Sequence, residues 1–462
     1  DEYGKALFTE DTALRRELGL LETVSIVINR IIGSGIFRTP GPIMALVLST
    51  SMFGAAWLIG GLITIFAAVC YAELVAMIPK SGGPYVFLRA AYPPVWSFLR
   101  GWAMFFVSET GSIAAVALVF AEYFSAMWNI IHGYPFPPLL VTGIALAVIA
   151  MLTAVNCYGV LLSGIVQDIF SFFKVIALGL VIGFCFTGPG SVLNYSSRFW
   201  PEHFSWESVI ALGAALRYVF FAYSGWEGAT YVAEEVRNPR KNLPLSLLIG
   251  ITGVIVLYLG ANMAYLYQVP VDVFKDSKWI AVDAMELAVG SIGGILISLA
   301  VMVNTFGNVS TQILCKARTW HAMARDGLFF RGFGRINPRY GTPNTSLIYQ
   351  GIWASVLLLF ASLSRHSYEA IIDFFTCTGV ISNIMTVGSL LILRKKYPDA
   401  ERPYRAWLYP WSAVIVIVFY VAFGVVTLFS AFVPSMMGLL LTSTGLLYYY
   451  RKKLPFYKRK TG

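Results

Sequence analysis

Long apolar runs, repeated along almost the whole chain, constrain the fold more than any other feature of this sequence. Twelve runs are separated by polar breaks, and most approach the length of about 20 residues that an α-helix needs to cross a bilayer. Charged residues make up 13% of the 462 residues, against about 25% in a soluble domain. The sequence therefore predicts an all-α polytopic membrane protein and excludes a soluble enzyme, a secreted disulfide scaffold and a disordered chain. The expected spans are 20–48, 52–78, 95–127, 138–156, 163–187, 206–235, 243–268, 282–316, 345–362, 368–393, 408–433 and 435–450.

The distribution of Lys and Arg predicts the orientation of these spans. Basic residues gather before the first span and after every second span, on one side of the membrane. The opposite loops contain only Arg198, Lys275, Lys278 and Arg365. The positive-inside rule therefore places both termini in the cytoplasm. Because this topology explains the net charge of +10, we expect the lipid bilayer as a partner and no nucleic acid.

Two spans carry small residues in the middle, where they weaken a continuous helix. Span 1 has Gly33-Ser34-Gly35 and span 6 has Ser224-Gly225-Trp226-Glu227. Small residues also serve close helix packing, but interrupted helices at matching positions of two halves point to the substrate site of a secondary transporter. The N–H groups freed by a break suit a carboxylate, and the freed carbonyls suit an ammonium group. A site with both features fits the backbone of a free amino acid.

Four segments of the chain resemble one family. They are IIGSGIF from Ile31, KSGGPYVFL from Lys80, QDIFSFFK from Gln167 and FAYSGWEGATYVAEEVRNPRKNLPLS from Phe221. Over nearly its whole length the sequence resembles the L-type amino acid transporter branch of the amino acid–polyamine–organocation (APC) superfamily. The resemblance implies amino acid exchange by alternating access and a LeuT-like inverted repeat of five plus five helices, with the helices of spans 1 and 6 unwound mid-membrane.

The expected domain organisation follows from this resemblance and from the short loops. A cytoplasmic amino-terminal segment, 1–19, precedes a single transmembrane domain, 20–450, and a basic cytoplasmic tail, 451–462. Within the domain, repeat one covers about 20–187 and repeat two about 206–393, and two extra helices follow over about 408–450. No loop is long enough to hold a second domain.

The resemblance also implies roles for the residues at the two breaks. Residues 33–35 would bind the substrate carboxylate, and carbonyls of Phe221, Ala222 and Ser224 would receive the amino group. The Phe221 ring would close over the substrate from outside. The full expected substrate-binding set is Ile31, Ile32, Gly33, Ser34, Gly35, Ser108, Glu109, Phe221, Ala222, Ser224, Gly225, Glu227, Thr378 and Gly379.

Lys174 lies inside span 5, where an ionisable side chain is costly and marks function by default. It resembles the family's lysine whose ammonium group occupies the place of sodium in sodium-coupled relatives. In that role it would bridge the break near Gly33 to span 8 at Asn304 or Ser310. This predicts sodium independence.

Three further charged residues inside the spans, Arg30, Glu109 and Arg217, depart from the family pattern. Because mutual pairing costs less than an isolated buried charge, we expect Glu109 to pair with Arg217 or Arg30, and all three to serve coupling or binding. Direct contact with a charged substrate side chain is the alternative. Ser224 stands where dibasic-amino-acid exchangers of the family carry an aspartate, which favours a neutral substrate.

The sequence thus predicts a sodium-independent exchanger of small to medium neutral amino acids in the cell membrane. A proton-coupled symporter of amino acids or polyamines, and an amino acid sensor, are the alternatives. An intramembrane enzyme is not expected, since no histidine lies inside a span. No cofactor or metal is expected either. Residues 128–138 lack the cysteine that links animal members to a heavy chain, so we expect no disulfide-linked partner and a stand-alone chain like the prokaryotic members.

Overall fold

The computed structural model describes residue 8 and residues 16–158, 164–201, 203–325, 327–339, 342–364 and 366–456. Most of the predicted amino-terminal segment 1–19, part of the tail 451–462 and Arg365 lie outside these residues. Eleven described helical stretches are long and apolar enough to cross a membrane. A further helix, α10 (Gly164–Thr187), contains a shorter apolar stretch, Phe172–Thr187. These helices confirm the predicted all-α polytopic membrane fold.

The helices follow the order of the predicted spans. The spanning elements are α2 (Leu20–Ile31) with α3 (Gly35–Arg38) and α4 (Pro40–Val47), α5 (Thr50–Met77), α7 (Pro94–Ala103) with η1 (Met104–Ser108) and α8 (Glu109–His132), α9 (Pro138–Cys157), α10, α12 (Trp206–Ala222) with η2 (Trp226–Glu235), α13 (Pro239–Gln268), α16 (Ser291–Arg325), α17 (Asn344–Ala361), α18 (Ser367–Lys396), α19 (Trp411–Ser430) and α20 (Phe432–Phe456). Shorter helices are α6 (Pro84–Ala91), α11 (Leu193–Ser196), α14 (Val271–Phe274), α15 (Ile280–Val289) and η3 (Arg331–Gly334).

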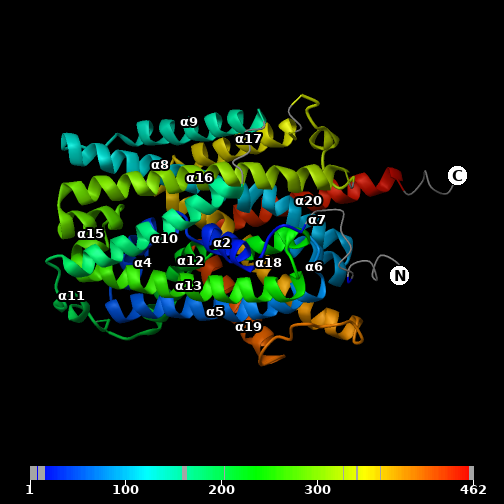
Figure 1. Ribbon diagram of the computed structural model, residues 1–462, viewed down its shortest axis with the longest axis horizontal. Coiled ribbons are helices and arrows are strands. Elements are labelled where there is room, and N and C mark those ends of the chain that lie inside the picture. Colours follow the sequence, from blue (N-terminus) through cyan, green and yellow to red (C-terminus); the bar gives the residue numbers. More distant parts are fainter. Residues whose placement is uncertain are drawn as a thin grey trace.

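The long helices run side by side in one bundle (Figure 1). In this view α2, α12 and α18 lie in the middle, α9 and α17 lie along one edge, and α19 lies at the other. The short helices α11 and α15 lie at one end of the bundle, and α6 lies at the opposite end. Residues 31–40 at the first break are all buried, as are Phe221, Ala222 and Tyr223 at the second, so both breaks lie inside protein, where a bilayer-spanning chain tolerates freed backbone groups.

Both predicted breaks are present. The first helical segment ends at Ile31, the chain passes through residues 32–34 without helical structure, and α3 begins at Gly35. The sixth span stops at Ala222, turns over residues 223–225 and resumes as the 3₁₀ helix η2. Gly225 has φ +94°, a left-handed conformation that glycine adopts without steric cost.

A third irregularity, in span 3, has no signal in the sequence pattern. Residues Met104–Ser108 form a π-helix, η1, immediately before Glu109. The Thr110 hydroxyl donates to the Phe105 carbonyl at 2.6 Å and so satisfies one acceptor in this wider turn. Single π turns inside α-helices occur frequently at functional sites. Here the π turn carries Ser108 and ends where the charged Glu109 begins.

Two predicted span boundaries are wrong. The span expected over 282–316 is two helices, α15 and α16, separated by Gly290, whose φ of +83° ends α15. Because apolar residues continue across this turn, hydropathy alone does not reveal it, and α16 also runs on to Arg325. The last two spans separate at Ala431 rather than at Pro434, which lies in the first turn of α20. Proline is tolerated there because the N–H groups of a first turn have no partner in the helix.

Candidate functional site

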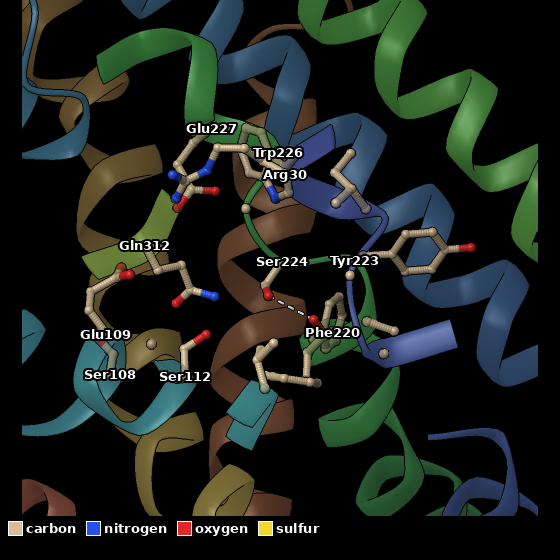
Figure 2. A pocket seen from close by; sticks show the side chains of 18 of the residues that line it. Arg30, Ser108, Glu109, Ser112, Phe220, Tyr223, Ser224, Trp226, Glu227 and Gln312 are labelled. Carbon is tan, nitrogen blue, oxygen red and sulfur yellow. Dashed lines mark hydrogen bonds between the residues drawn. The ribbon is translucent and has the colours of Figure 1, made fainter. Parts of the chain in front are cut away.

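Both breaks open onto one cavity of about 210 Å³ in the middle of the bundle. Most of the residues around it come from α2, η1 and α8, α12 and η2, α16 and α18 (Figure 2), and α3, α5, α7, α10 and α19 contribute one residue each. The predicted residues that line it are Arg30, Ile31, Gly33, Ser34, Gly35, Ser108, Glu109, Lys174, Phe221, Ala222, Ser224, Gly225, Glu227 and Gly379. Residues that were not predicted but line it are Asn29, Thr64, Arg100, Ser112, Val116, Phe220, Tyr223, Trp226, Gly307, Asn308, Thr311, Gln312, Phe375, Ser382, Asn383 and Tyr420.

The two breaks touch each other through glycines. A Cβ atom added to Gly35 would lie 2.5 Å from the Cα of Ala222. A Cβ atom added to Gly225 would lie 2.7 Å from the carbonyl oxygen of Arg30. Real Cβ atoms do not approach other heavy atoms this closely, so each position requires glycine for the crossing. The two interrupted spans therefore form one unit with the cavity beside it.

The carbonyls that the first break frees are mostly covered by protein groups. In a continuous helix Asn29 and Ile31 would accept hydrogen bonds from the residues four positions later. Here the Lys174 ammonium donates to the Asn29 carbonyl at 3.3 Å, and the Tyr258 hydroxyl donates to the Ile31 carbonyl at 2.9 Å. Tyr258 lies on α13 and was not predicted, because nothing in its local sequence distinguishes it from a packing aromatic.

Most of the hydrogen-bond donors at the first break remain without a partner. Within the described part of the chain, the backbone N–H groups of Gly33, Ser34 and Gly35 make no backbone–backbone hydrogen bond outside the helices, and of the three only Gly33 has the Tyr258 hydroxyl within reach. The Ser34 hydroxyl is also buried without a hydrogen-bond partner there. Buried polar groups are nearly always hydrogen-bonded, so this cluster of open donors indicates a ligand with acceptor oxygens, such as a carboxylate.

The second break offers fewer open carbonyls than predicted. The Phe221 carbonyl already accepts from the Ser224 hydroxyl at 2.7 Å and from the Ser224 N–H at 3.1 Å. Two bonds fill both lone pairs of a carbonyl oxygen. The Ala222 carbonyl lies 3.3 Å from the Tyr258 hydroxyl, whose single hydrogen it shares with the nearer Ile31 carbonyl. Among the described residues no hydrogen bond reaches the Tyr223 or Ser224 carbonyl. Of the three expected acceptors, the Ser224 carbonyl therefore remains available to an ammonium group, and the Tyr223 carbonyl, which was not expected, is available beside it.

Lys174 is buried, and it contacts the inner end of the first break, as predicted, at Asn29 rather than at Gly33. The predicted partners on α16 are wrong. Ser310 accepts a hydrogen bond from Asn156 of α9, and Asn304 lies outside the cavity lining. The α16 residue next to the break is Asn308, whose side-chain nitrogen would lie 3.0 Å from a Cβ added to Gly33. Asn308 lies one helical turn after the predicted Asn304 on α16, so the prediction chose the right helix but the wrong turn.

The predicted pair of Glu109 with Arg217 is wrong, and Arg30 acts on Glu109 only beside a closer partner. Glu109 pairs with Lys316 at 2.7 Å, and Arg217 pairs with Asp373 at 3.1 Å. Lys316 is only 3% exposed because α16 continues past it, although the sequence pattern placed it in a cytoplasmic loop. The Arg30 side chain instead lies against η2, with its Cδ 2.5 Å from a Cβ added to Gly228.

Three other expected residues do not line the cavity. Ile32 is fully buried in the packed core, and Arg217 is held by Asp373 away from the lining. The Thr378 hydroxyl donates to the Phe375 carbonyl in its own helix at 2.7 Å, while the neighbouring Gly379 does line the cavity. The side chains of α18 that face the cavity are those of Phe375, Ser382 and Asn383.

Comparison with known proteins identifies the family. Residues 18–450 match the family model described as amino acid permease. The chain belongs to the amino acid permease family. The b(0,+)-type amino acid transporter 1 of Mus musculus is 30% identical to it over 408 residues, which cover 88% of this chain and 82% of that protein. The large neutral amino acids transporter small subunit 2 of Homo sapiens is 31% identical over 442 residues, 95% of this chain and 80% of that protein.

These findings confirm that the permease is a member of the L-type branch of the APC superfamily with a LeuT-like fold. They also confirm an amino acid transporter rather than an enzyme. The human relative is named as a small subunit, so the expectation that no heavy chain associates gains no support from it.

Replacing Gly225 with alanine is expected to destabilise the permease by about 1–3 kcal/mol, the usual cost of a strained backbone position. Gly225 combines φ +94° with the close contact to Arg30. The matched control is Gly253→Ala in α13, where an added Cβ meets no heavy atom within 4 Å and alanine favours the helix. Thermal unfolding in detergent measures both variants. Equal midpoints would show that the crossing tolerates a side chain.

Proposed function

We propose that this permease is a sodium-independent exchanger of neutral amino acids that works by alternating access. The observation that carries the proposal is the opening of both helix breaks onto the same buried cavity. The N–H groups of Ser34 and Gly35, which make no backbone–backbone hydrogen bond, suit a carboxylate, and the Tyr223 and Ser224 carbonyls suit an ammonium group. A site with both kinds of group favours a zwitterion over a polyamine, which has no carboxylate.

The surroundings of Lys174 support sodium independence. Its ammonium group donates to a carbonyl that the first break has freed, which is the kind of oxygen ligand a bound cation would need. Because the Lys174 ammonium already supplies a positive charge at this carbonyl, a bound sodium ion is not needed there. The neutral substrate class is supported by Ser224, since the hydroxyl brings no charge to the second break.

We also propose that the protein resides in the cell membrane with both termini in the cytoplasm. The bundle end with α11 and α15 carries the few basic residues of the sparsely charged loops, Arg198, Lys275 and Lys278. The end with α6 carries many more, which suits the cytoplasmic side. Residues 133–137, between α8 and α9, contain no cysteine, which supports a chain without a disulfide-linked partner at this segment.

A proton-coupled symporter is the second candidate. The carboxylates of Glu109 and Glu227 line the cavity and supply groups that could carry a proton. Purified protein in liposomes separates the two functions. We expect labelled amino acid to enter liposomes preloaded with unlabelled amino acid at the same rate with and without sodium, and hardly to enter empty ones. Uptake into empty liposomes that follows an imposed proton gradient would establish symport instead, and binding without flux would indicate a sensor.

A further inference from the structure

One wall of the cavity carries two buried polar groups that have no partner. The Oε1 atom of Gln312, on α16, and the hydroxyl of Ser108, in η1, are buried and make no hydrogen bond within the described part of the chain. Gln312 is only 8% exposed, and Figure 2 shows its amide projecting into the cavity on the side of Ser112 and Ser224. Both residues line the cavity.

The Gln312 amide has a defined orientation. Its Nε2 donates to the Asn308 Oδ1 at 2.7 Å, one helical turn earlier. This leaves Oε1 as an acceptor directed away from Asn308, whereas the Ser108 hydroxyl is free to donate or accept. A buried polar group without a partner costs about 1–3 kcal/mol, so a ligand that bonds to both groups recovers a substantial free energy.

The charge next to these groups is already compensated. Glu109 follows Ser108 directly, and its carboxylate is held by Lys316 at 2.7 Å. The Lys316 ammonium in turn lies 4.9 Å from the ring centre of Tyr231. This carboxylate is therefore neutralised by a buried partner, and the other cations that act on it, Arg30 and Arg100, also line the cavity. The wall therefore suits an uncharged polar group better than a cationic one.

We propose that Ser108 and Gln312 form the subsite for the substrate side chain and select amino acids with a carboxamide or hydroxyl group over apolar ones of the same shape. A carboxamide supplies an N–H for the Gln312 oxygen and an oxygen for the Ser108 hydroxyl. Gln312 is then a specificity-determining residue of the exchange reaction, and this assignment rests on the function proposed above. It narrows the substrate class from neutral to polar neutral amino acids.

The size of the preference follows from the unpaired groups. A site that hydrogen-bonds its substrate discriminates strongly against an analogue without the polar group, whereas a purely apolar pocket barely distinguishes isosteres. We expect asparagine to exceed leucine, and threonine to exceed valine, by about tenfold or more in kcat/KM, since each 1.4 kcal/mol corresponds to about a factor of ten.

The experiment measures exchange of these isosteric pairs in proteoliposomes for the wild-type protein, Gln312→Met and a control. Methionine keeps the length of the side chain and removes its hydrogen bonds. We expect the asparagine-to-leucine ratio to fall at least tenfold in Gln312→Met. Gln350→Met is the matched control, because Gln350 contacts the same helix through the Ile313 carbonyl at 2.6 Å but does not line the cavity. Its ratio should equal that of the wild type.

Each result supports or overturns the assignment. A wild-type preference for leucine, valine and methionine would place the side chain against the aromatic residues Phe220 and Phe375 and overturn it, even if Gln312→Met failed to fold. An unchanged ratio in Gln312→Met would overturn it as well. Failure of the wild-type protein to exchange any amino acid would instead contradict the proposed function, so the two failures are distinguishable.

Discussion

Replacement of Lys174 with alanine is expected to reduce amino acid exchange by about tenfold or more while the protein still folds. The buried ammonium group donates to the Asn29 carbonyl at 3.3 Å in the last turn of α2. A continuous helix would use the Gly33 N–H for this bond, so Lys174 replaces a bond that the break removes. Hydrogen bonds to charged groups contribute about 1.5–3 kcal/mol, or about 10–100-fold in an equilibrium. Its loss frees the inner end of the first interrupted helix from α10 and biases the conformations that alternating access requires.

The matched control is Lys396→Ala. The Lys396 ammonium also donates to a backbone carbonyl, that of Ala90 at 3.0 Å, but Lys396 is exposed at the end of α18 and does not line the cavity. Exchange per reconstituted molecule should be close to wild type in this control. Thermal unfolding of both variants in detergent separates a loss of transport from a loss of folding. Equal turnover in Lys174→Ala and wild type would remove Lys174 from the mechanism.

The sequence predicted the breaks because their cause is local. Glycine and serine in the middle of an apolar run weaken a helix wherever the rest of the chain lies. The structure adds that Gly35 and Gly225 also allow the two helices to cross in contact. Which side chains donate hydrogen bonds to the freed carbonyls could not be predicted in the same way. Tyr258 is about thirty-six residues from Ala222 along the chain, and only the packing of α13 against both breaks brings its hydroxyl there.

The charge pairs failed for a different reason. Pairing Glu109 with Arg30 or Arg217 assumed that all buried charges had been recognised. Lys316, Asp373 and Glu369 were overlooked because each lies near the end of a predicted span, where a charged residue is usually exposed. Helix ends are the least certain part of a sequence-based prediction. The extension of α16 to Arg325 buries Lys316 and supplies the partner that Glu109 needs.

The overlooked acidic residues also create a second strong expectation, at the Arg38 side of the cavity. Arg38, in α3, is 3% exposed and contacts Glu122 of α8 at 2.7 Å and Glu369 of α18 at 3.2 Å. Its guanidinium also lies 4.8 Å from the ring centre of Tyr368. One turn further along α18, Asp373 holds Arg217 of α12. The helical segments on this side of both breaks are therefore tied to the same face of α18.

Replacing Arg38 with methionine should destabilise the protein by about 3–5 kcal/mol, because it leaves two carboxylates that are only 15% and 17% exposed without their cation. The control is Arg198→Met, whose partner Asp272 lies at 3.0 Å in an exposed pair, where the expected loss is at most about 1 kcal/mol. Unfolding midpoints in detergent compare the two variants. Adding Glu122→Gln and Glu369→Gln to Arg38→Met should restore much of the loss, because uncharged amides cost less to bury than carboxylates. If Arg38→Met were no less stable than Arg198→Met, the buried network would not be what holds α3 against α8 and α18.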